Sequence, residues 1–226
     1  MVTALAFFSC ALAGYLIGSV SFAILISKGI YKKDVRSLGS GNAGMTNMAR
    51  NFGKKAAVLT LFGDAAKGAA AVMLGRLLFA ALSPELDILY GAYVAGITVI
   101  LGHMFPLYFG FKGGKGIATS AGVILSLSPV VGIILISIFL LFFKVSGMVS
   151  LGSVIGIGMY PVVTLVWSLC YSHRLPVYST LCAVVISGLI VLMHRENIGR
   201  IRRGTEYKFK KEETEETPAE PGVKNQ

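Results

Sequence analysis

The sequence has 226 residues, of which 54% are hydrophobic and 14% are charged, and its mean hydropathy is +0.72. Soluble domains average about 25% charged residues, so this composition excludes an ordinary soluble globule and a disordered chain. The 3 cysteines lie scattered in apolar stretches, which excludes a disulfide scaffold. The net charge of +10 lies in short segments between apolar runs, a pattern typical of membrane proteins rather than of nucleic-acid binding.

Six apolar runs are long enough to cross a bilayer, which requires about 20 residues. The first run has no charge and no basic segment before it, so we interpret it as a membrane helix and not as a cleaved signal peptide. The sequence thus predicts an all-α, polytopic integral membrane protein. The runs are residues 3–26, 56–82, 88–108, 117–143, 148–172 and 175–193.

The loop charges predict an orientation. Residues 28–55 hold seven Lys and Arg against one acid, Asp34, and residues 195–211 are also strongly basic. The loop between the second and third runs has Glu85 and Asp87 and no base. Because basic loops stay in the cytoplasm, we expect the N-terminus outside and the C-terminus inside. Six spans cannot satisfy both placements, so one apolar run must turn back on itself.

The run 117–143 is the one expected to turn, because Ser126-Leu127-Ser128-Pro129 lies in its middle and proline breaks a helix. Its first arm would be roughly 17 Å long, which is tolerated only inside the bundle. The sequence therefore predicts seven transmembrane helices, the fourth of them short. We expect residues 1–211 to form a single membrane domain and residues 212–226 to form a disordered acidic tail.

Two features inside the spans favour helix packing. The segments 14–18 and 152–156 both have the pattern Gly-x-x-x-Gly, which is typical of close contacts between helices. Asp64 and Lys67 lie three positions apart, so they can form an ion pair on one helix face. That pair either has a structural role or orients a site on the inner side of the membrane.

Residues 36–50 are the first of four polar segments expected on the inner face. This segment is rich in Gly, Asn, Ser and Thr, so its backbone can curl and present several N–H groups to an anion such as phosphate. Arg50 adds a bidentate donor. The alternative is a polar turn with basic anchors for lipid headgroups.

The second segment contains the Gly-Gly-Lys-Gly run 113–116, which leads directly into a predicted helix. Free N–H groups, the positive end of the helix and a lysine therefore converge, as in an anion site. It is not a Walker A loop, because Phe109 and Gly116 stand where that motif needs Gly and Ser or Thr, so ATP is not implied. We interpret Lys115 as a phosphate ligand and Lys112 as a headgroup anchor.

The third and fourth segments are residues 146–153 and 194–206. Ser150 follows a glycine near a helix start, so it is either an N-cap or a phosphate ligand. On a helix that continues from the last span, His194 and Asn197 share one face. His194 is a candidate base or hydrogen-bond donor, whereas the arginines around it, taken alone, indicate stop-transfer anchors.

Several catalytic signatures are absent from the sequence. No histidine is followed five positions later by Asp, no Gly-x-Ser-x-Gly elbow occurs, and no His and Cys cluster indicates zinc. A transporter or channel for a phosphorylated anion would also need basic, Gly-rich loops at broken helices. The clustering of charge on one face and the lack of a visible inverted repeat disfavour that alternative.

Three segments, in this order and between these spans, resemble the bacterial acyl-phosphate:glycerol-3-phosphate acyltransferase family, PlsY: GSGNAGMTNMAR, GHMFPLYFGFKGGKGIATSAGV and HRENIGRIRRGTE. The resemblance covers residues 5–207. It implies a seven-helix enzyme of the bacterial cytoplasmic (inner) membrane with its active site facing the cytoplasm. The implied reaction transfers a fatty acyl group from acyl phosphate to the 1-hydroxyl of glycerol 3-phosphate. The products would be lysophosphatidic acid and inorganic phosphate, the first committed step of phospholipid biosynthesis.

The resemblance also implies partners and site residues. It implies no metal and no other cofactor. The implied partners are the two substrates, membrane lipids and a soluble enzyme that produces acyl phosphate; no nucleic acid is expected, and the chain is expected to be a monomer. The implied site residues are Ser40, Gly41, Asn42, Arg50, Gly113, Gly114, Lys115, Gly116, Ser150, His194, Asn197 and Glu206.

The chemistry of such a reaction agrees with these residue types. Acyl phosphate is an activated anhydride, so orientation and stabilisation of the oxyanion are the work that remains. The proton leaves either through the substrate phosphate or through a histidine. The groups expected to hold the acyl-phosphate headgroup are Lys115, Ser40 and the N–H groups around Gly41 and Gly114. The groups expected to position glycerol 3-phosphate are His194, Asn197, Arg50 and Ser150.

Overall fold

The computed structural model describes residues 2–209, which fold into helices joined by short loops, with no strand among them. The predicted tail, residues 212–226, lies outside the described residues. The α-helices are α1 (Val2–Gly18), α2 (Phe22–Gly29), α3 (Met45–Leu82), α4 (Leu89–Met104), α5 (Ile117–Leu127), α6 (Pro129–Ser146), α7 (Val149–Gly158), α8 (Tyr160–Trp167), α9 (Pro176–Met193) and α10 (Arg195–Arg202). Short 3₁₀ turns η1 (Val35–Ser37) and η2 (Leu107–Phe109) and a π-helical turn η3 (Ser168–Ser172) complete the set.

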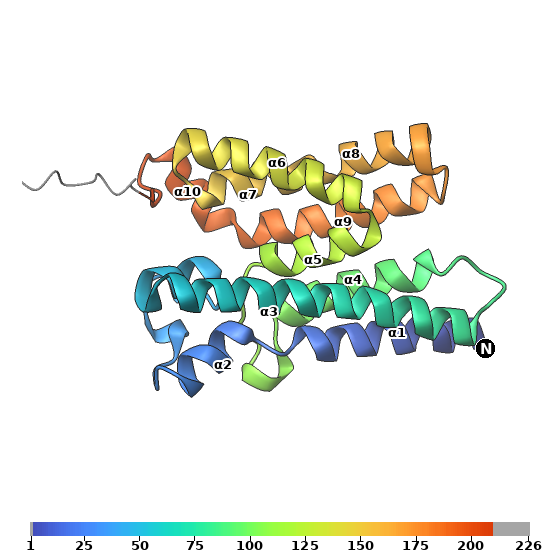
Figure 1. Cartoon of the computed structure of the whole chain (residues 1–226), viewed down its shortest axis with the longest axis horizontal. Helices are drawn as coiled ribbons and strands as arrows, with labels where there is room; N and C mark the ends of the chain where they lie inside the picture. The colour runs from blue at the N-terminus through green and yellow to red at the C-terminus, as the bar shows by residue number, and fades with distance from the viewer. Residues whose placement is uncertain (1, 210–226) are drawn as a thin grey trace, which may run out of the picture.

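The helices form two layers with α5 between them (Figure 1). The first four helices make one layer, in which α1 packs on α3 and α4. The other layer contains α6 to α9, and α5 contacts α3, α4 and α6. A main core cluster of buried residues joins the layers through Val72, Val99, Val123 and Ile186. The central position of α5 brings both of its ends into the interior, where the cavities described below lie.

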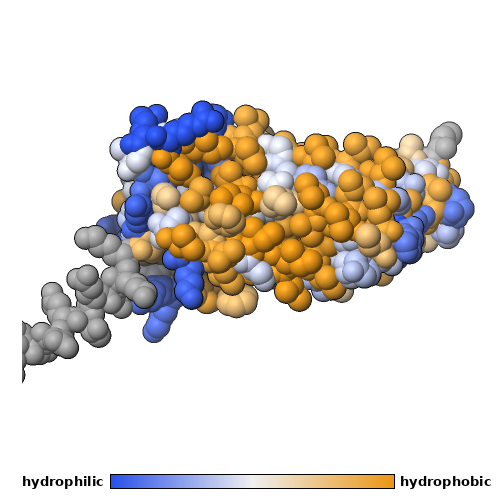
Figure 2. Space-filling view, turned by 90° about the horizontal axis from the view of Figure 1, so that it is seen from above, coloured by the Kyte–Doolittle hydropathy of each residue, from blue (hydrophilic) through white to orange (hydrophobic). Residues whose placement is uncertain are grey.

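The composition and length of the helices are those of a multi-span integral membrane protein. Among the described residues, six helices or helix pairs are long and apolar enough to cross a membrane, and α5 is a shorter apolar helix. The predicted break in the run 117–143 is confirmed, because α5 ends at Leu127 and α6 begins at Pro129. Figure 2 shows an apolar surface along the middle of the bundle and hydrophilic residues at its ends.

Two spans expected to be continuous are broken instead. The first run divides into α1 and α2, with Ser21 as N-cap accepting a hydrogen bond from the N–H of Ile24. The fifth run divides at Met159 between α7 and α8. The second run starts earlier than expected, at Met45, and kinks at Gly53, whose φ of 84° lies in the left-handed region. Hydrophobicity alone cannot reveal the breaks near Ser21 and Met159, because the residues on both sides of each are apolar.

The two Gly-x-x-x-Gly segments pack as predicted. A Cβ on Gly14 would lie 2.6 Å from the carbonyl oxygen of Ala95, and one on Gly18 would lie 2.2 Å from that of Val99, so α1 and α4 approach through backbone. A Cβ on Gly152 would lie 2.7 Å from the carbonyl oxygen of Phe139. These glycines bring helices together and are not site residues.

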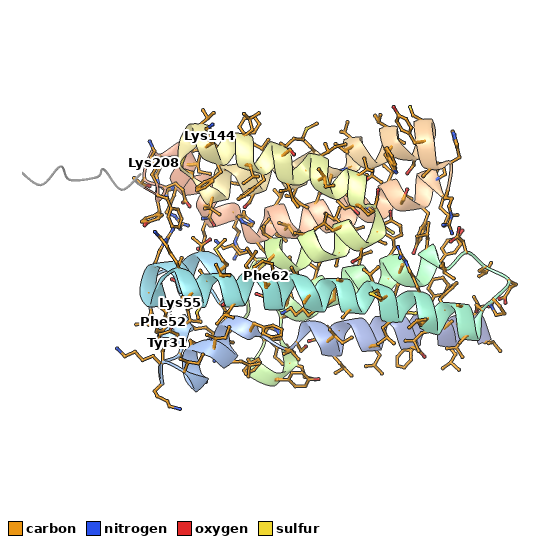
Figure 3. The ribbon with its side chains drawn as sticks, in the orientation of Figure 1. Tyr31, Phe52, Lys55, Phe62, Lys144 and Lys208 are labelled. Atoms are coloured by element: carbon orange, nitrogen blue, oxygen red, sulfur yellow. The ribbon has the colours of Figure 1, made fainter. Side chains whose placement is uncertain are left out.

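Basic side chains gather at one end of the bundle. Lys55 of α3, Lys144 of α6 and Lys208 lie at the end where α10 also lies (Figure 3). At the opposite end, Arg174 forms an ion pair of 2.6 Å with Asp87. The polar segments found in the sequence therefore converge on the basic end.

Candidate active site

A cavity of about 770 Å³ receives residues from all four polar segments. Apolar side chains from α5 to α7, among them Ile124, Leu135 and Phe139, line the rest of its wall. It therefore has a polar end and an apolar wall, as a site for an amphiphile requires. The predicted site residues that line it are Ser40, Asn42, Arg50, Lys115, Gly116, Ser150, His194, Asn197 and Glu206.

Three helices begin at this cavity. The N-terminal residues Met45 of α3, Ile117 of α5 and Val149 of α7 line its wall, and none of the three N-caps has a side-chain hydrogen bond to its helix. The first turn of a helix carries N–H groups without intrahelical acceptors and the positive end of the helix dipole. The cavity is therefore suited to anions even before its side chains are considered.

The carboxylate of Glu206 connects the polar side chains. It accepts hydrogen bonds from Ser150 Oγ at 2.8 Å, from Asn197 Nδ2 at 2.7 Å and from Arg200 Nε at 2.7 Å. Burial disfavours the charged carboxylate, but these three hydrogen bonds together hold the pKa of Glu206 below its usual value. The side chain of Lys115 donates to Asn197 Oδ1, which extends the network to the start of α5.

The charges at the polar end do not balance. Lys115, Arg50 and Arg200 are three cations around the carboxylate of Glu206. The other carboxylate of the lining, Asp64, is neutralised by Lys67 at 2.8 Å, so a surplus of two positive charges remains. Burial and the neighbouring charge of Arg200 lower the pKa of Lys115. The guanidinium of Arg50 lies 3.8 Å from the ring centre of Tyr207, a cation–π contact that holds it in place. Such a surplus favours binding of two phosphate groups.

His194 stands where α9 ends, not on a continuing helix as expected. Its φ and ψ of −98° and 7° break the helix before α10, yet His194 and Asn197 both line the cavity. Nδ1 of His194 lies 2.8 Å from the carbonyl oxygen of Ile190, which can only accept, so Nδ1 is the donor. Burial lowers the pKa of His194 to about 4, so the ring is neutral at pH 7 and Nε2 is an acceptor.

Three predicted glycines lie outside the lining of the cavity. The N–H groups of Gly41, Gly113 and Gly114 already donate to the carbonyl oxygens of Leu38, Met104 and His103. These three N–H groups are therefore paired with backbone acceptors, and none of these glycines lines the cavity; the expected phosphate contacts of the N–H groups around them stay a prediction. A Cβ on Gly114 would lie 2.2 Å from Nε2 of His103, so this glycine lets the loop pack on α4 and fixes the approach to Lys115.

The ion pair predicted between Asp64 and Lys67 is present and buried, with 2.8 Å between its charged atoms. It belongs to a larger cluster: Lys67 Nζ lies 3.0 Å from Nδ1 of His103 and donates to the carbonyl oxygen of Val20 at 2.6 Å. Asp64 and His103 also line the cavity. The cluster thus ties the break between α1 and α2 to α3, α4 and the loop that carries Lys115.

Sequence reasoning missed Arg200, Tyr207 and His103 as parts of the site. Arg200 lies three residues after Asn197 on α10, a spacing that places both on one face, but the surrounding basic cluster indicated membrane anchors. His103 lies inside the segment GHMFPLYFGFKGGKGIATSAGV, but it was not singled out there, and Tyr207 lies one residue beyond the last of the three segments. Within residues 2–209, no group of three or more His, Cys, Asp and Glu is arranged to hold a metal ion.

Fold and site together define an integral membrane protein with a cavity for a phosphate-bearing amphiphile. The family model described as glycerol-3-phosphate acyltransferase matches residues 8–204. Curated relatives named glycerol-3-phosphate acyltransferase include one from Clostridioides difficile, 38% identical and covering 88% of this chain and 93% of its own. Another, from Bordetella pertussis, is 43% identical and covers 87% of this chain and 89% of its own.

Solved structures agree with the family model. The crystal structure of PlsY, an integral membrane glycerol 3-phosphate acyltransferase, in its glycerol 3-phosphate form matches with a TM-score of 0.77 and 34% identity, covering 90% of this chain and 96% of that one. Its lysophosphatidic acid form matches with a TM-score of 0.75 and 33% identity. The chain belongs to the glycerol-3-phosphate acyltransferase family and is an acyltransferase, not a transporter.

Proposed function

We propose that this enzyme transfers a fatty acyl group from acyl phosphate to the 1-hydroxyl of glycerol 3-phosphate, releasing lysophosphatidic acid and inorganic phosphate. The observation that supports this best is the surplus of two positive charges beside an apolar wall in one cavity. Acyl phosphate and glycerol 3-phosphate each bring one phosphate, and the acyl chain needs apolar surroundings. An acyl-CoA donor would instead bring a large polar nucleotide.

Each substrate has a set of groups in this proposal. Lys115, Ser40 and the first turn of α5 hold the acyl-phosphate headgroup, because Lys115 directly precedes that helix N-terminus. Arg50, Ser150, Asn197 and His194 position glycerol 3-phosphate, and Glu206 holds Ser150, Asn197 and Arg200 in place. The acyl chain lies along Ile124, Leu135 and Phe139.

The reaction needs no enzyme nucleophile. The 1-hydroxyl oxygen attacks the carbonyl carbon of acyl phosphate, the oxyanion forms near Lys115, and the bond to the phosphate oxygen then breaks. Because the pKa of His194 is lowered to about 4, its Nε2 is a weak base. A phosphate monoester has a second pKa of about 6, so the substrate phosphate takes the hydroxyl proton while His194 accepts a hydrogen bond and orients the hydroxyl.

We also infer the membrane in which the enzyme lies and its orientation there. We infer a bacterial cytoplasmic membrane, with the N-terminus outside and the cavity and α10 on the cytoplasmic side, because basic side chains gather at the α10 end (Figure 3). There it can receive acyl phosphate from a soluble enzyme that produces it. The chain acts as a monomer in this proposal, since the four polar segments of one chain line the cavity.

A release assay in detergent tests the donor. Purified protein is given acyl phosphate or acyl-CoA with glycerol 3-phosphate, and inorganic phosphate and lysophosphatidic acid are measured. We expect both products from acyl phosphate in equal amounts, dependent on glycerol 3-phosphate, and none from acyl-CoA. Turnover of acyl-CoA at a similar rate, or phosphate release without the acylated product, would contradict the proposal.

Labelling of single cysteines tests the orientation. After the native cysteines are replaced, one cysteine is placed at Lys112 beside the site and one at Glu85 in the loop at the other end. In intact cells, a membrane-impermeant thiol reagent should label the second position and not the first. The reverse pattern would place the cavity outside the cytoplasm.

A further inference from the structure

A second cavity, of about 250 Å³, lies at the other end of α5. It is lined by residues of α3, α4, α8 and α9 and by the break between α5 and α6, including Ser128. Ile124 lines both cavities, so the C-terminal part of α5 separates them. The catalytic groups start at Lys115, at the N-terminal end of α5, which is roughly 17 Å long. The second cavity is therefore outside the reaction site.

Arg76 of α3 brings an uncompensated charge into this cavity. Its Nη2 donates to the carbonyl oxygen of Ser126 at 2.7 Å, but its Nε is buried and has no hydrogen-bond acceptor. No carboxylate of the described residues lies within 4 Å of the guanidinium. The other cation of the cavity, Arg174, is neutralised by two hydrogen bonds to Asp87, at 2.6 and 3.1 Å.

The surroundings favour an anion near Arg76. Helix α6 begins here, and its N-cap Ser128 lines the cavity without a side-chain bond to the helix, so the positive helix end is available. The hydroxyl of Thr164 on the same wall is buried without a hydrogen-bond partner and adds a donor. A cation without a counter-charge is costly within a membrane, and a bound anion would offset that cost.

We propose that this cavity binds a phosphate-bearing anion, with the Arg76 guanidinium as its main ligand. Planar guanidinium groups match phosphate through paired N–H donors. Arg76 lies six residues before Leu82, the end of α3, which is about 9 Å along the helix axis. A long side chain can reach from that depth toward the headgroup layer. The phosphate can therefore come from a lipid headgroup or from free phosphate in solution.

The test measures binding in full-length protein in which Lys115→Gln weakens anion binding at the catalytic cavity. Native mass spectrometry counts retained phosphatidylglycerol, with phosphatidylcholine as the zwitterionic comparison, and thermal unfolding is followed in inorganic phosphate. Adding Arg76→Gln should weaken binding at least tenfold, whereas Asp87→Asn, which frees Arg174 from its partner, should strengthen it. The matched control Lys33→Gln removes an exposed cation elsewhere. It should change neither the retention of phosphatidylglycerol nor the stabilisation by inorganic phosphate.

The outcomes separate the two sources. Loss of phosphatidylglycerol retention alone identifies a lipid headgroup site, and loss of stabilisation by inorganic phosphate alone identifies a site for a free anion. If Arg76→Gln changes neither quantity while the protein unfolds at the wild-type temperature, the proposal is wrong and Arg76 only caps α5. Acyltransferase activity of Arg76→Gln, measured with Lys115 intact, should stay near the wild-type value and reports correct folding.

Discussion

Two buried charge clusters differ in how their charges balance. In the cluster of Asp64, Lys67 and His103, one carboxylate meets one ammonium at 2.8 Å beside a histidine, so the charges neutralise each other. At the polar end of the active site, three cations, among them Lys115, face the carboxylate of Glu206. A neutralised cluster can hold helices together but has little attraction left for a ligand. A surplus of cations binds anions, and its members repel each other when the site is empty.

Removing one charge from the neutralised cluster should have the largest effect. Asp64→Asn leaves Lys67 buried without a counter-charge, which costs on the order of 3–5 kcal/mol of stability. We expect a large drop in the unfolding temperature, partly recovered in the double variant Asp64→Asn, Lys67→Met. The exposed Lys55→Met on the same helix serves as control. An unchanged unfolding temperature in Asp64→Asn would show that the pair does not support the fold.

Removing a surplus cation should affect turnover instead. Lys115→Ala should lower kcat/KM for acyl phosphate about a hundredfold or more, since it removes a cation from the developing oxyanion. The unfolding temperature should change little, because burial and the neighbouring Arg200 disfavour the charged form of Lys115, which offsets the loss of its hydrogen bond to Asn197. Steady-state kinetics and a melting curve measure both effects. The exposed neighbour Lys112 provides the control: Lys112→Ala should retain activity, and equal losses in both variants would refute a specific role for Lys115.

A pH titration of stability tests the buried, neutral His194. In the folded protein the pKa of His194 is about 4, whereas an unfolded chain binds that proton near pH 6.5. As the pH falls from 6.5 toward 4, the unfolded state gains the proton first, so the wild type loses stability relative to His194→Asn. At pH 5 the difference is about 2 kcal/mol, and above pH 6.5 the pH-dependent part is absent.

Melting curves of both proteins at pH 7.5 and pH 5 measure this difference. The exposed His173 gives a matched variant, His173→Asn, which removes a histidine that does not line the cavity. The pH profile of kcat/KM near pH 6.5 should likewise be the same in the wild type and in His194→Asn. A step in the wild type that the variant lacks is not expected. Such a step would mean that His194 titrates normally and acts as a general base.

The smallest expected effect is at the carboxylate that joins the catalytic groups. Glu206→Gln keeps an acceptor oxygen but weakens the bonds from Ser150, Asn197 and Arg200, each worth about 1 kcal/mol. We expect KM for glycerol 3-phosphate to rise about tenfold, with a smaller change in kcat. The control Glu196→Gln, at an exposed position of α10, should be neutral. A loss of kcat at unchanged KM would instead indicate direct participation in the chemistry.

Most of the fold could be predicted from apolar patterning, including the break at Ser128 and Pro129, because proline acts locally. The breaks near Ser21 and Met159 could not, since their backbone groups are satisfied by distant contacts: the carbonyl oxygen of Val20, for example, accepts from Lys67. Local sequence has no information about a partner 47 residues away.

The candidate site was predicted to a similar extent. Lys115 and Arg50 were predicted because they are cations in or beside glycine-rich segments, and Asn197 because it shares a helix face with His194 and lies in a segment that resembles the family. The hydrogen bonds of Gly113 and Gly114 could not be predicted, because whether a backbone N–H is free depends on the helix end it packs against, here α4. Arg200 was missed because a cation near a membrane surface looks the same whether it anchors the chain or lines a cavity.

The last described residues of the chain complete the site. Glu206 bonds to Ser150 of α7, and the N–H of Phe209 donates to the carbonyl oxygen of Gly147 at 2.9 Å. A nascent chain that has inserted α1 to α9 therefore still lacks the tether that orders its polar groups. Without Glu206, Ser150 and Asn197 lose the carboxylate that holds them in place, so these polar groups become ordered only after residues 206–209 have docked.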